Sequence, residues 1–142
     1  MTMKKILFPL LIALMGLGLS SCGNENYIYE NQEVLHISLT ADSWTRCQSE
    51  DVPLYYAATF DVPELTRKVY GSGLVSCEIV FSDARQALPY ITHYQNAAKE
   101  MWTRTVDFQY AVGKVTVFVT TSDHLDEVPE VMDFRLSLVY QD

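Results

Sequence analysis

The residues best suited to chemistry in this chain include three widely separated histidines: His36, His93 and His124. A metalloprotease or hydrolase would place such residues in a pattern like HExxH, GxSxG or a cysteine–histidine pair, and the sequence contains none of these patterns. Glu78 and Asp107 are candidates for the paired carboxylates of a glycosidase, but no motif brings them together. The sequence therefore predicts no enzyme, no catalytic residues and no cofactor.

An acidic stretch at residues 122–130 is the only segment that favours a cation. Its carboxylates are the hard oxygen ligands that calcium prefers. The stretch lacks the spacing of an EF-hand loop and its central glycine, so the carboxylates need not converge. We expect a solvated loop and no metal site.

Aromatic side chains are the best functional hint, with 2 Trp, 9 Tyr and 6 Phe in the chain. Tyrosine and tryptophan present a flat apolar ring with a polar group, which suits both sugar rings and protein interfaces. Phe81, Trp102, Phe108 and Phe134 fall on alternating apolar faces, so we expect them in the core. The candidate ligand-binding rings are Trp44, Tyr55, Tyr56, Tyr90 and Tyr94.

The chain has three cysteines, of which Cys47 and Cys77 lie in the body. In an oxidising compartment these two can form a disulfide, which would stabilise the fold by about 3–4 kcal/mol through loop closure. The alternative is that Cys77 is a free core residue, because it alternates with apolar neighbours. The sequence leaves both possibilities open.

The third cysteine, Cys22, follows an export signal. Lys4 and Lys5 precede an uncharged, mostly apolar run at residues 6–19, which is short for a membrane span and typical of a signal peptide. Leu19, Ser20 and Ser21 then lead into Cys22, and this order resembles the lipobox of bacterial lipoproteins. The resemblance implies a signal peptide at residues 1–21 and lipidation of Cys22. Residues 22–32 are polar and are expected to be a flexible tether.

Composition bounds the remaining body. The chain has 142 residues, 10 basic and 18 acidic side chains and a net charge of −8, so it lacks the basic surface of a nucleic-acid-binding protein. Its length fits one domain, which we place at residues 33–142.

Alternation of apolar and polar residues dominates this domain and indicates β-strands. The predicted strands are residues 33–40, 54–61, 74–82, 88–95, 102–110, 114–121 and 134–140, with a tight hairpin turn at residues 111–113. One short helix is expected between Asp61 as its cap and Gly71 as its end. These elements predict an all-β fold, an antiparallel two-sheet β-sandwich of about seven strands with one short helix. A small closed barrel is the alternative.

The order and spacing of several segments in this body are distinctive. They are Trp44, residues 55–56, residues 61–66, residues 73–81, residues 88–90, Trp102 and residues 113–115. In this pattern the chain resembles a group of small cell-envelope lipoproteins of Bacteroides-type gut bacteria. The resemblance implies attachment to the membrane through the lipid anchor, most often at the outer membrane, and an all-β body. That group has no established activity, so the resemblance implies no chemistry.

Two functions remain open at this stage. The first is a non-catalytic envelope lipoprotein whose β-sandwich binds or scaffolds another protein, since free strand edges can accept a partner strand. The second is a glycan-binding module that uses exposed aromatic rings. A planar row of exposed rings would favour sugar, and a bare strand edge would favour protein.

Overall fold

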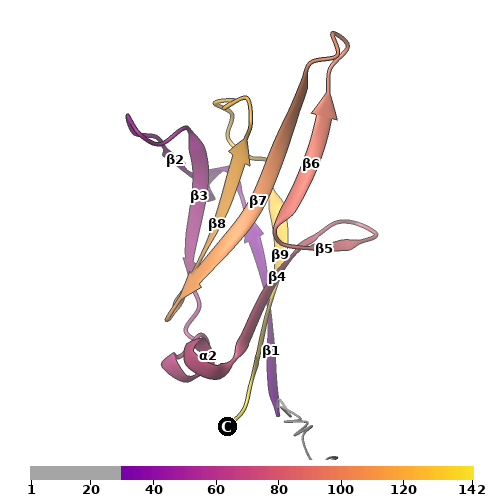
Figure 1. Cartoon of the computed structure of the whole chain (residues 1–142). Helices are drawn as coiled ribbons and strands as arrows, with labels where there is room; N and C mark the ends of the chain where they lie inside the picture. The colour runs from indigo at the N-terminus through magenta and orange to yellow at the C-terminus, as the bar shows by residue number, and fades with distance from the viewer. Residues whose placement is uncertain (1–29) are drawn as a thin grey trace, which may run out of the picture.

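The computed structural model describes residues 30–142 as two antiparallel β-sheets packed face to face (Figure 1). The four-stranded sheet has the order β1–β9–β4–β5, and the five-stranded sheet has the order β2–β3–β8–β7–β6. The elements are β1 (Asn31–Leu39), η1 (Ala41–Ser43), β2 (Thr45–Cys47), β3 (Tyr55–Asp61), α2 (Arg67–Ser72), β4 (Leu74–Val80), β5 (Arg85–Ala87), β6 (Tyr90–Gln95), β7 (Met101–Ala111), β8 (Lys114–Thr121) and β9 (Met132–Tyr140).

The predicted β-sandwich is confirmed, and the sheets do not close into a barrel. Each of the seven expected strands is present. β2 and β5 were not predicted, because they have three residues each and are too short to show a period of two. β1 begins at Asn31, so the strand includes the last two residues assigned to the tether. The predicted signal peptide, Cys22 and the tether up to residue 29 lie outside the described residues.

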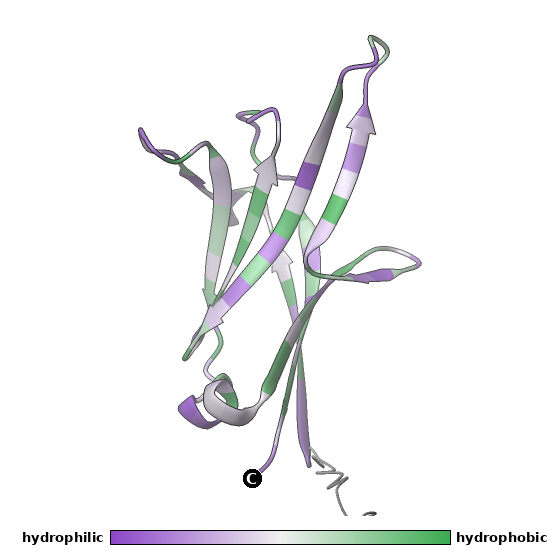
Figure 2. Ribbon diagram, in the orientation of Figure 1, coloured by the Kyte–Doolittle hydropathy of each residue, from purple (hydrophilic) through white to green (hydrophobic). Residues whose placement is uncertain are grey.

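The core lies between the two sheets and is made by one face of each strand. Alternation produces this arrangement, because successive side chains of a strand point to opposite faces. Figure 2 shows the resulting bands of hydrophobic and hydrophilic residues along β7 and its neighbours. The four-stranded sheet contributes Val75, Cys77, Ile79, Phe134, Leu136 and Leu138, and the five-stranded sheet contributes Tyr56, Ala58, Val106, Val115, Val117 and Val119.

A tight turn joins β7 to β8, as the sequence predicted, but it has two residues, because Ala111, expected in the turn, belongs to β7. Ala111 pairs with Lys114, which leaves Val112 and Gly113 as the loop. Gly113 has a φ of +75°, a conformation that glycine adopts at little cost. The backbone of Gly113 also accepts a hydrogen bond from Val62 and donates one to Leu65, so the turn holds the segment that follows β3.

The helix begins later than the sequence predicted. Asp61 is the last residue of β3, opposite Lys114, and the residue that caps α2 is Thr66. The hydroxyl of Thr66 accepts a hydrogen bond from the backbone N–H of Val69 at 3.3 Å. The backbone bonds of residues 62–65 to the β7–β8 turn explain the shift, because they hold this segment out of the helix. Gly71 lies within the helix, and Gly73 ends it.

The disulfide considered between Cys47 and Cys77 is not formed; both thiols are free. Cys77 is buried in β4 of one sheet, while Cys47 lies on β2, an edge strand of the other sheet. The core that separates the sheets therefore separates the two sulfurs. Burial raises the pKa of the Cys77 thiol to about 12.

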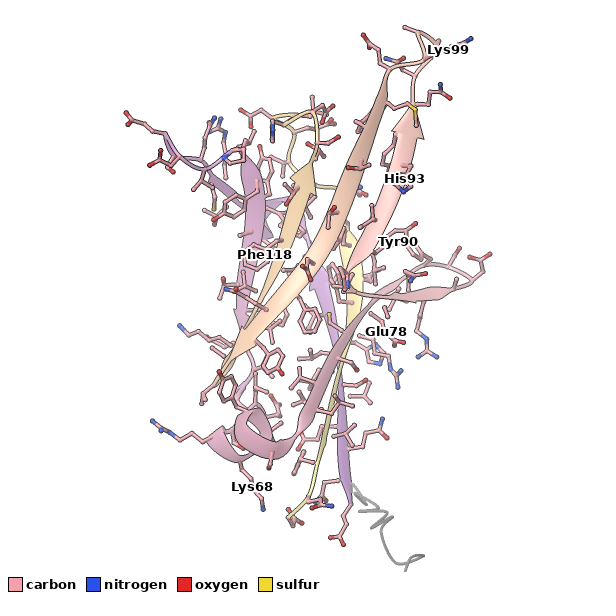
Figure 3. The ribbon with its side chains drawn as sticks, viewed as in Figure 1. Lys68, Glu78, Tyr90, His93, Lys99 and Phe118 are labelled. Carbon is pink, nitrogen blue, oxygen red and sulfur yellow. The ribbon has the colours of Figure 1, made fainter. Side chains whose placement is uncertain are left out.

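The two ends of the sandwich differ. Figure 1 shows the start of β1, the C-terminus and α2 at one end, below the sheets. The β6–β7 hairpin extends past the other strands at the opposite end, where the loops after β2 and β8 also lie. We refer to the end with the start of β1 as the tether end and to the end with the β6–β7 hairpin as the loop end. Figure 3 shows Lys68 and Lys99 at the tether end and the loop end, respectively.

Candidate functional site

A cleft of about 350 Å³ lies at the loop end of the sandwich. It forms because the loop-end parts of β6 and β7 extend past the opposing sheet (Figure 1). Their inward-facing side chains are therefore not covered by that sheet. The segment between β8 and β9 closes the other side. The lining residues are Tyr94, Trp102, Arg104, Val119, Thr121, Leu125, Glu127, Val128, Pro129 and Glu130.

One wall of the cleft is a pair of stacked rings. Tyr94 on β6 is the register partner of Trp102 on β7, so both side chains project from the same face of the sheet. Their ring centroids lie 5.5 Å apart with an interplanar angle of 13°. Two nearly parallel rings thus line a hollow that is wide enough for a small ligand.

A charged pair crosses the base of this wall. Nη1 of Arg104 on β7 donates a hydrogen bond to Oε1 of Glu130 at 2.7 Å, and Nη2 points to the sulfur of Met132 at 3.7 Å. Glu130 precedes β9, so the pair connects the two sheets. A second, smaller hollow of about 120 Å³ shares Tyr94, Arg104 and Glu130 and continues to Tyr90.

Tyr90 completes the aromatic lining of the smaller hollow. Its ring meets that of Phe81 edge to face, with centroids 5.8 Å apart. Phe81 was expected in the core, but it follows the last residue of β4 and is exposed. Because β4 ends at Val80, Phe81 does not follow the alternation of the strand into the core, and its ring lies against Tyr90 instead.

The segment that closes the cleft, residues 122–131, is attached to the five-stranded sheet through Asp126. This carboxylate accepts hydrogen bonds from the Tyr56 hydroxyl at 2.6 Å and from Nε of Arg46 at 2.9 and 3.0 Å. The hydrogen bonds from Arg46 and then Tyr56 lower the pKa of Asp126, and the bond to Asp126 raises the pKa of Tyr56. Asp126 therefore holds this loop against the five-stranded sheet.

Glu130 remains ionised at the mouth of the cleft. Burial alone would raise the pKa of Glu130, but the hydrogen bond and charge of Arg104, with a backbone hydrogen bond, outweigh burial and lower it. A general acid needs the opposite shift, so this carboxylate is suited to accept hydrogen bonds from a ligand. Glu127, exposed nearby, offers a second carboxylate.

Of the five rings proposed from the sequence, Tyr90 and Tyr94 line these two hollows. Trp44 is 9% exposed and Tyr56 is 6% exposed, so both of these candidate rings are buried in the core and neither lines the two hollows. Trp44 directly follows η1, where the chain crosses between sheets, and its ring fills the core. Tyr55 lies on the opposite face of β3 from Tyr56, as alternation requires, and packs on Phe118.

The sequence did not indicate that Trp102 and Arg104 line the cleft. Trp102 was assigned to the core because it lies on the apolar face of β7. It does lie on that face, but it is only half-buried. The signal that could have found it is the pairing of two aromatic residues on neighbouring strands, Tyr94 and Trp102, at the ends of those strands farthest from the β7–β8 turn.

The remaining chemical candidates are dispersed. His36 and His93 are exposed on β1 and β6, and His124 is in the β8–β9 segment, so the three lie on different elements. Glu78 accepts a hydrogen bond from Arg135, while Asp107 is exposed on the other sheet. Within residues 30–142, no group of three or more His, Cys, Asp or Glu side chains is placed to hold a metal ion.

Comparison with known proteins gives no assignment for this site. No family model matches the chain, and no match was found among curated proteins or among solved structures. Across residues 30–142, none of the helices has the length and apolar character needed to cross a membrane.

Proposed function

We propose that this chain is a lipid-anchored cell-envelope protein whose β-sandwich binds a saccharide, without catalysing a reaction, in the cleft at the loop end. The observation that carries the proposal is the stacked pair of Tyr94 and Trp102 in a cleft that also contains carboxylates. Of the two functions left open by the sequence, this geometry favours the glycan.

The chemistry of the lining fits a saccharide. Flat rings pack against the apolar faces of sugar rings, and the hydroxyls at the sugar edge need charged or polar partners. Glu127, Glu130 and Thr121 supply acceptors beside the rings, and Arg104 supplies donors. Hydrogen bonds between hydroxyls and charged groups are stronger than those between neutral groups, which gives such a site its selectivity.

The anchor would present this cleft away from the membrane. The lipobox-like Cys22 precedes β1, and β1 begins at the tether end, opposite the cleft (Figure 1). A ligand outside the membrane would then reach the cleft without obstruction by the bilayer. Mass spectrometry of the mature chain tests the anchor directly, because lipidation adds acyl chains to Cys22 and Cys22→Ser removes them.

Binding is tested by affinity electrophoresis and calorimetry against a broad panel of polysaccharides and oligosaccharides. We expect Tyr94→Ala and Trp102→Ala each to weaken binding by about tenfold or more, which corresponds to about 1.4 kcal/mol. Tyr55→Ala is the matched control, since this ring lies on the outer face of the same sheet. Flat titrations across the whole panel would refute a saccharide ligand.

Protease treatment of intact cells distinguishes the source of the saccharide. Loss of the domain from intact cells would indicate the cell surface and environmental or host glycans. Protection until the outer membrane is opened would indicate the periplasm and envelope glycans.

Protein binding has one supporting observation, the free edge of β1. This nine-residue strand pairs only with β9, and it contains no lysine or proline of the kind that protects strand edges. A partner strand could add there through backbone hydrogen bonds. Crosslinking from residues of β1 in cells would capture a specific partner if this edge is used, and Val34→Pro would abolish the capture.

A further inference from the structure

We propose that the tether end carries a membrane-docking patch, through which the anchored domain rests on the bilayer interface with its cleft pointing outward. The patch consists of Tyr70, Tyr110 and Val112 with three basic residues, Arg67, Lys68 and Lys114. The proposal rests on the lipid anchor proposed above and goes beyond it, because a tether alone leaves the domain free to rotate.

The first observation is a row of rings that the core does not cover. Tyr70 on α2 meets Tyr110 on β7 edge to face, with centroids 5.9 Å apart. Tyr110 in turn lies 6.2 Å from Phe108 in a stacked arrangement. Tyr70 is 51% exposed, Tyr110 37% and the following turn residue Val112 46%, so apolar surface is offered to an outside partner.

The second observation concerns the basic residues. The arginines elsewhere in residues 30–142, namely Arg46, Arg85, Arg104 and Arg135, each form an ion pair. Arg67, Lys68 and Lys114 are exposed and form no ion pair with any residue of the described body, and Lys99 at the loop end is the other such cation. Figure 3 shows Lys68 projecting from α2 at the tether end. These cations can contact lipid phosphates while the rings lie among the headgroups.

The third observation identifies the occupant. The nine residues from Cys22 to Glu30 span at most about 30 Å when extended, so a lipid on Cys22 keeps the tether end close to the bilayer. A short tether gives the patch a high effective concentration of membrane. A bilayer is thus the partner that this end of the domain meets most often.

The acidic residues at the tether end explain why docking to the membrane would depend on the tether. Asp61 ends β3, Glu64 lies between β3 and α2, and Glu30, Glu33 and Asp142 lie at the start of β1 and the end of the chain, so acidic side chains at this end offset the three cations. Attraction to anionic lipid is therefore weak, and insertion of the tyrosine rings supplies the favourable contact. We expect docking of the anchored chain and little binding of the Cys22→Ser chain.

The test uses tryptophan fluorescence in the full-length lipidated chain, reconstituted in vesicles of phosphatidylethanolamine and phosphatidylglycerol with brominated acyl chains. Tyr70→Trp places a reporter in the patch, and Ala98→Trp places a matched reporter in the exposed β6–β7 loop at the opposite end. The wild-type chain gives the background from Trp44 and Trp102. We expect a blue shift and quenching for Tyr70→Trp and only background quenching for Ala98→Trp.

Two further measurements distinguish failure of the docking patch from failure of the lipid anchor. Mass spectrometry of the same samples reports lipid on Cys22, and adding Tyr110→Glu and Val112→Glu to the Tyr70→Trp chain should abolish the quenching with an unchanged circular dichroism spectrum. Equal quenching of the two reporters in a lipidated chain overturns the docking patch and leaves the anchor standing. Absence of lipid from Cys22 overturns the anchor and the docking that depends on it.

Discussion

Arg104 on β7 and Glu130 before β9 are joined by a hydrogen bond of 2.7 Å that connects the two sheets at the base of the loop-end cleft. The Arg104 side chain is 18% exposed and the Glu130 side chain is 66% exposed, so the ion pair is partly exposed to solvent. Both residues line the cleft and also the smaller hollow beside Tyr90.

Removing the ion pair between Arg104 and Glu130 should lower the stability of the fold moderately. We expect Arg104→Ala to lower the free energy of unfolding by about 1–2 kcal/mol, because a partly exposed ion pair and the packing of the arginine stem are both lost. Arg104→Lys should recover only part of this, since lysine lacks the planar fork. Urea unfolding measures both. An unfolding midpoint unchanged in Arg104→Ala would show that the pair contributes nothing.

The lowered pKa of Glu130 predicts a specific dependence on pH. A carboxylate with a lower pKa in the folded state stabilises the fold above its unfolded pKa, ordinarily 4.5, and this contribution is lost as the pH falls through the folded value. Wild type should therefore be more stable than Glu130→Gln at neutral pH, and the difference should shrink below pH 4.5. Thermal unfolding across this range checks the sign. A difference that grows on acidification would contradict it.

The two body cysteines should differ sharply in reactivity. We expect Cys47 to react with thiol reagents in the native Cys22→Ser chain and Cys77 to react only after denaturation, because Cys77 is 1% exposed and its pKa is raised to about 12. Mass spectrometry after alkylation counts the modified sites. Two unreactive thiols in the denatured, unreduced chain would reveal a disulfide and contradict the structure.

A pair of glycine substitutions should have opposite signs. Gly113→Ala is expected to destabilise by about 1 kcal/mol because the φ of +75° is unfavourable for alanine, although nothing lies within 4 Å of the added Cβ. Gly71→Ala, inside α2 and equally open, should stabilise by about 0.5–1 kcal/mol. Denaturant midpoints measure both. Similar shifts in the two variants would argue against the left-handed turn.

The attachment of residues 122–131 to the five-stranded sheet should respond to a single hydroxyl. Tyr56→Phe removes the 2.6 Å hydrogen bond to Asp126 while keeping the ring in the core, so we expect a loss of about 1 kcal/mol and faster amide exchange of the loop. Hydrogen–deuterium exchange with mass spectrometry resolves the segment. Val117→Ala, in the core of the same sheet, is the control: it should destabilise the whole domain without a selective effect on the loop.

The sequence by itself determined the class of fold and most strand positions. Alternation over residues 74–80 and 114–121 can be satisfied only by strands that bury one face, and the residue types at Val112 and Gly113 determined the hairpin turn. The opposite orientation of Tyr55 and Tyr56 also followed from the period of two. These features are local, so they can be read from neighbouring residues.

Only the tertiary structure decided depth and proximity. Trp44, a candidate ligand-binding ring, is buried, whereas Trp102, expected in the core, lines the cleft, because alternation gives the face of a strand and not what covers it. The start of α2 at Thr66 and the pairing of Arg104 with Glu130 depend on contacts between segments distant in the sequence. The cleft exists because β6 and β7 extend beyond the opposing sheet, and the relative lengths and offsets of two packed sheets are set by the assembly of the whole domain.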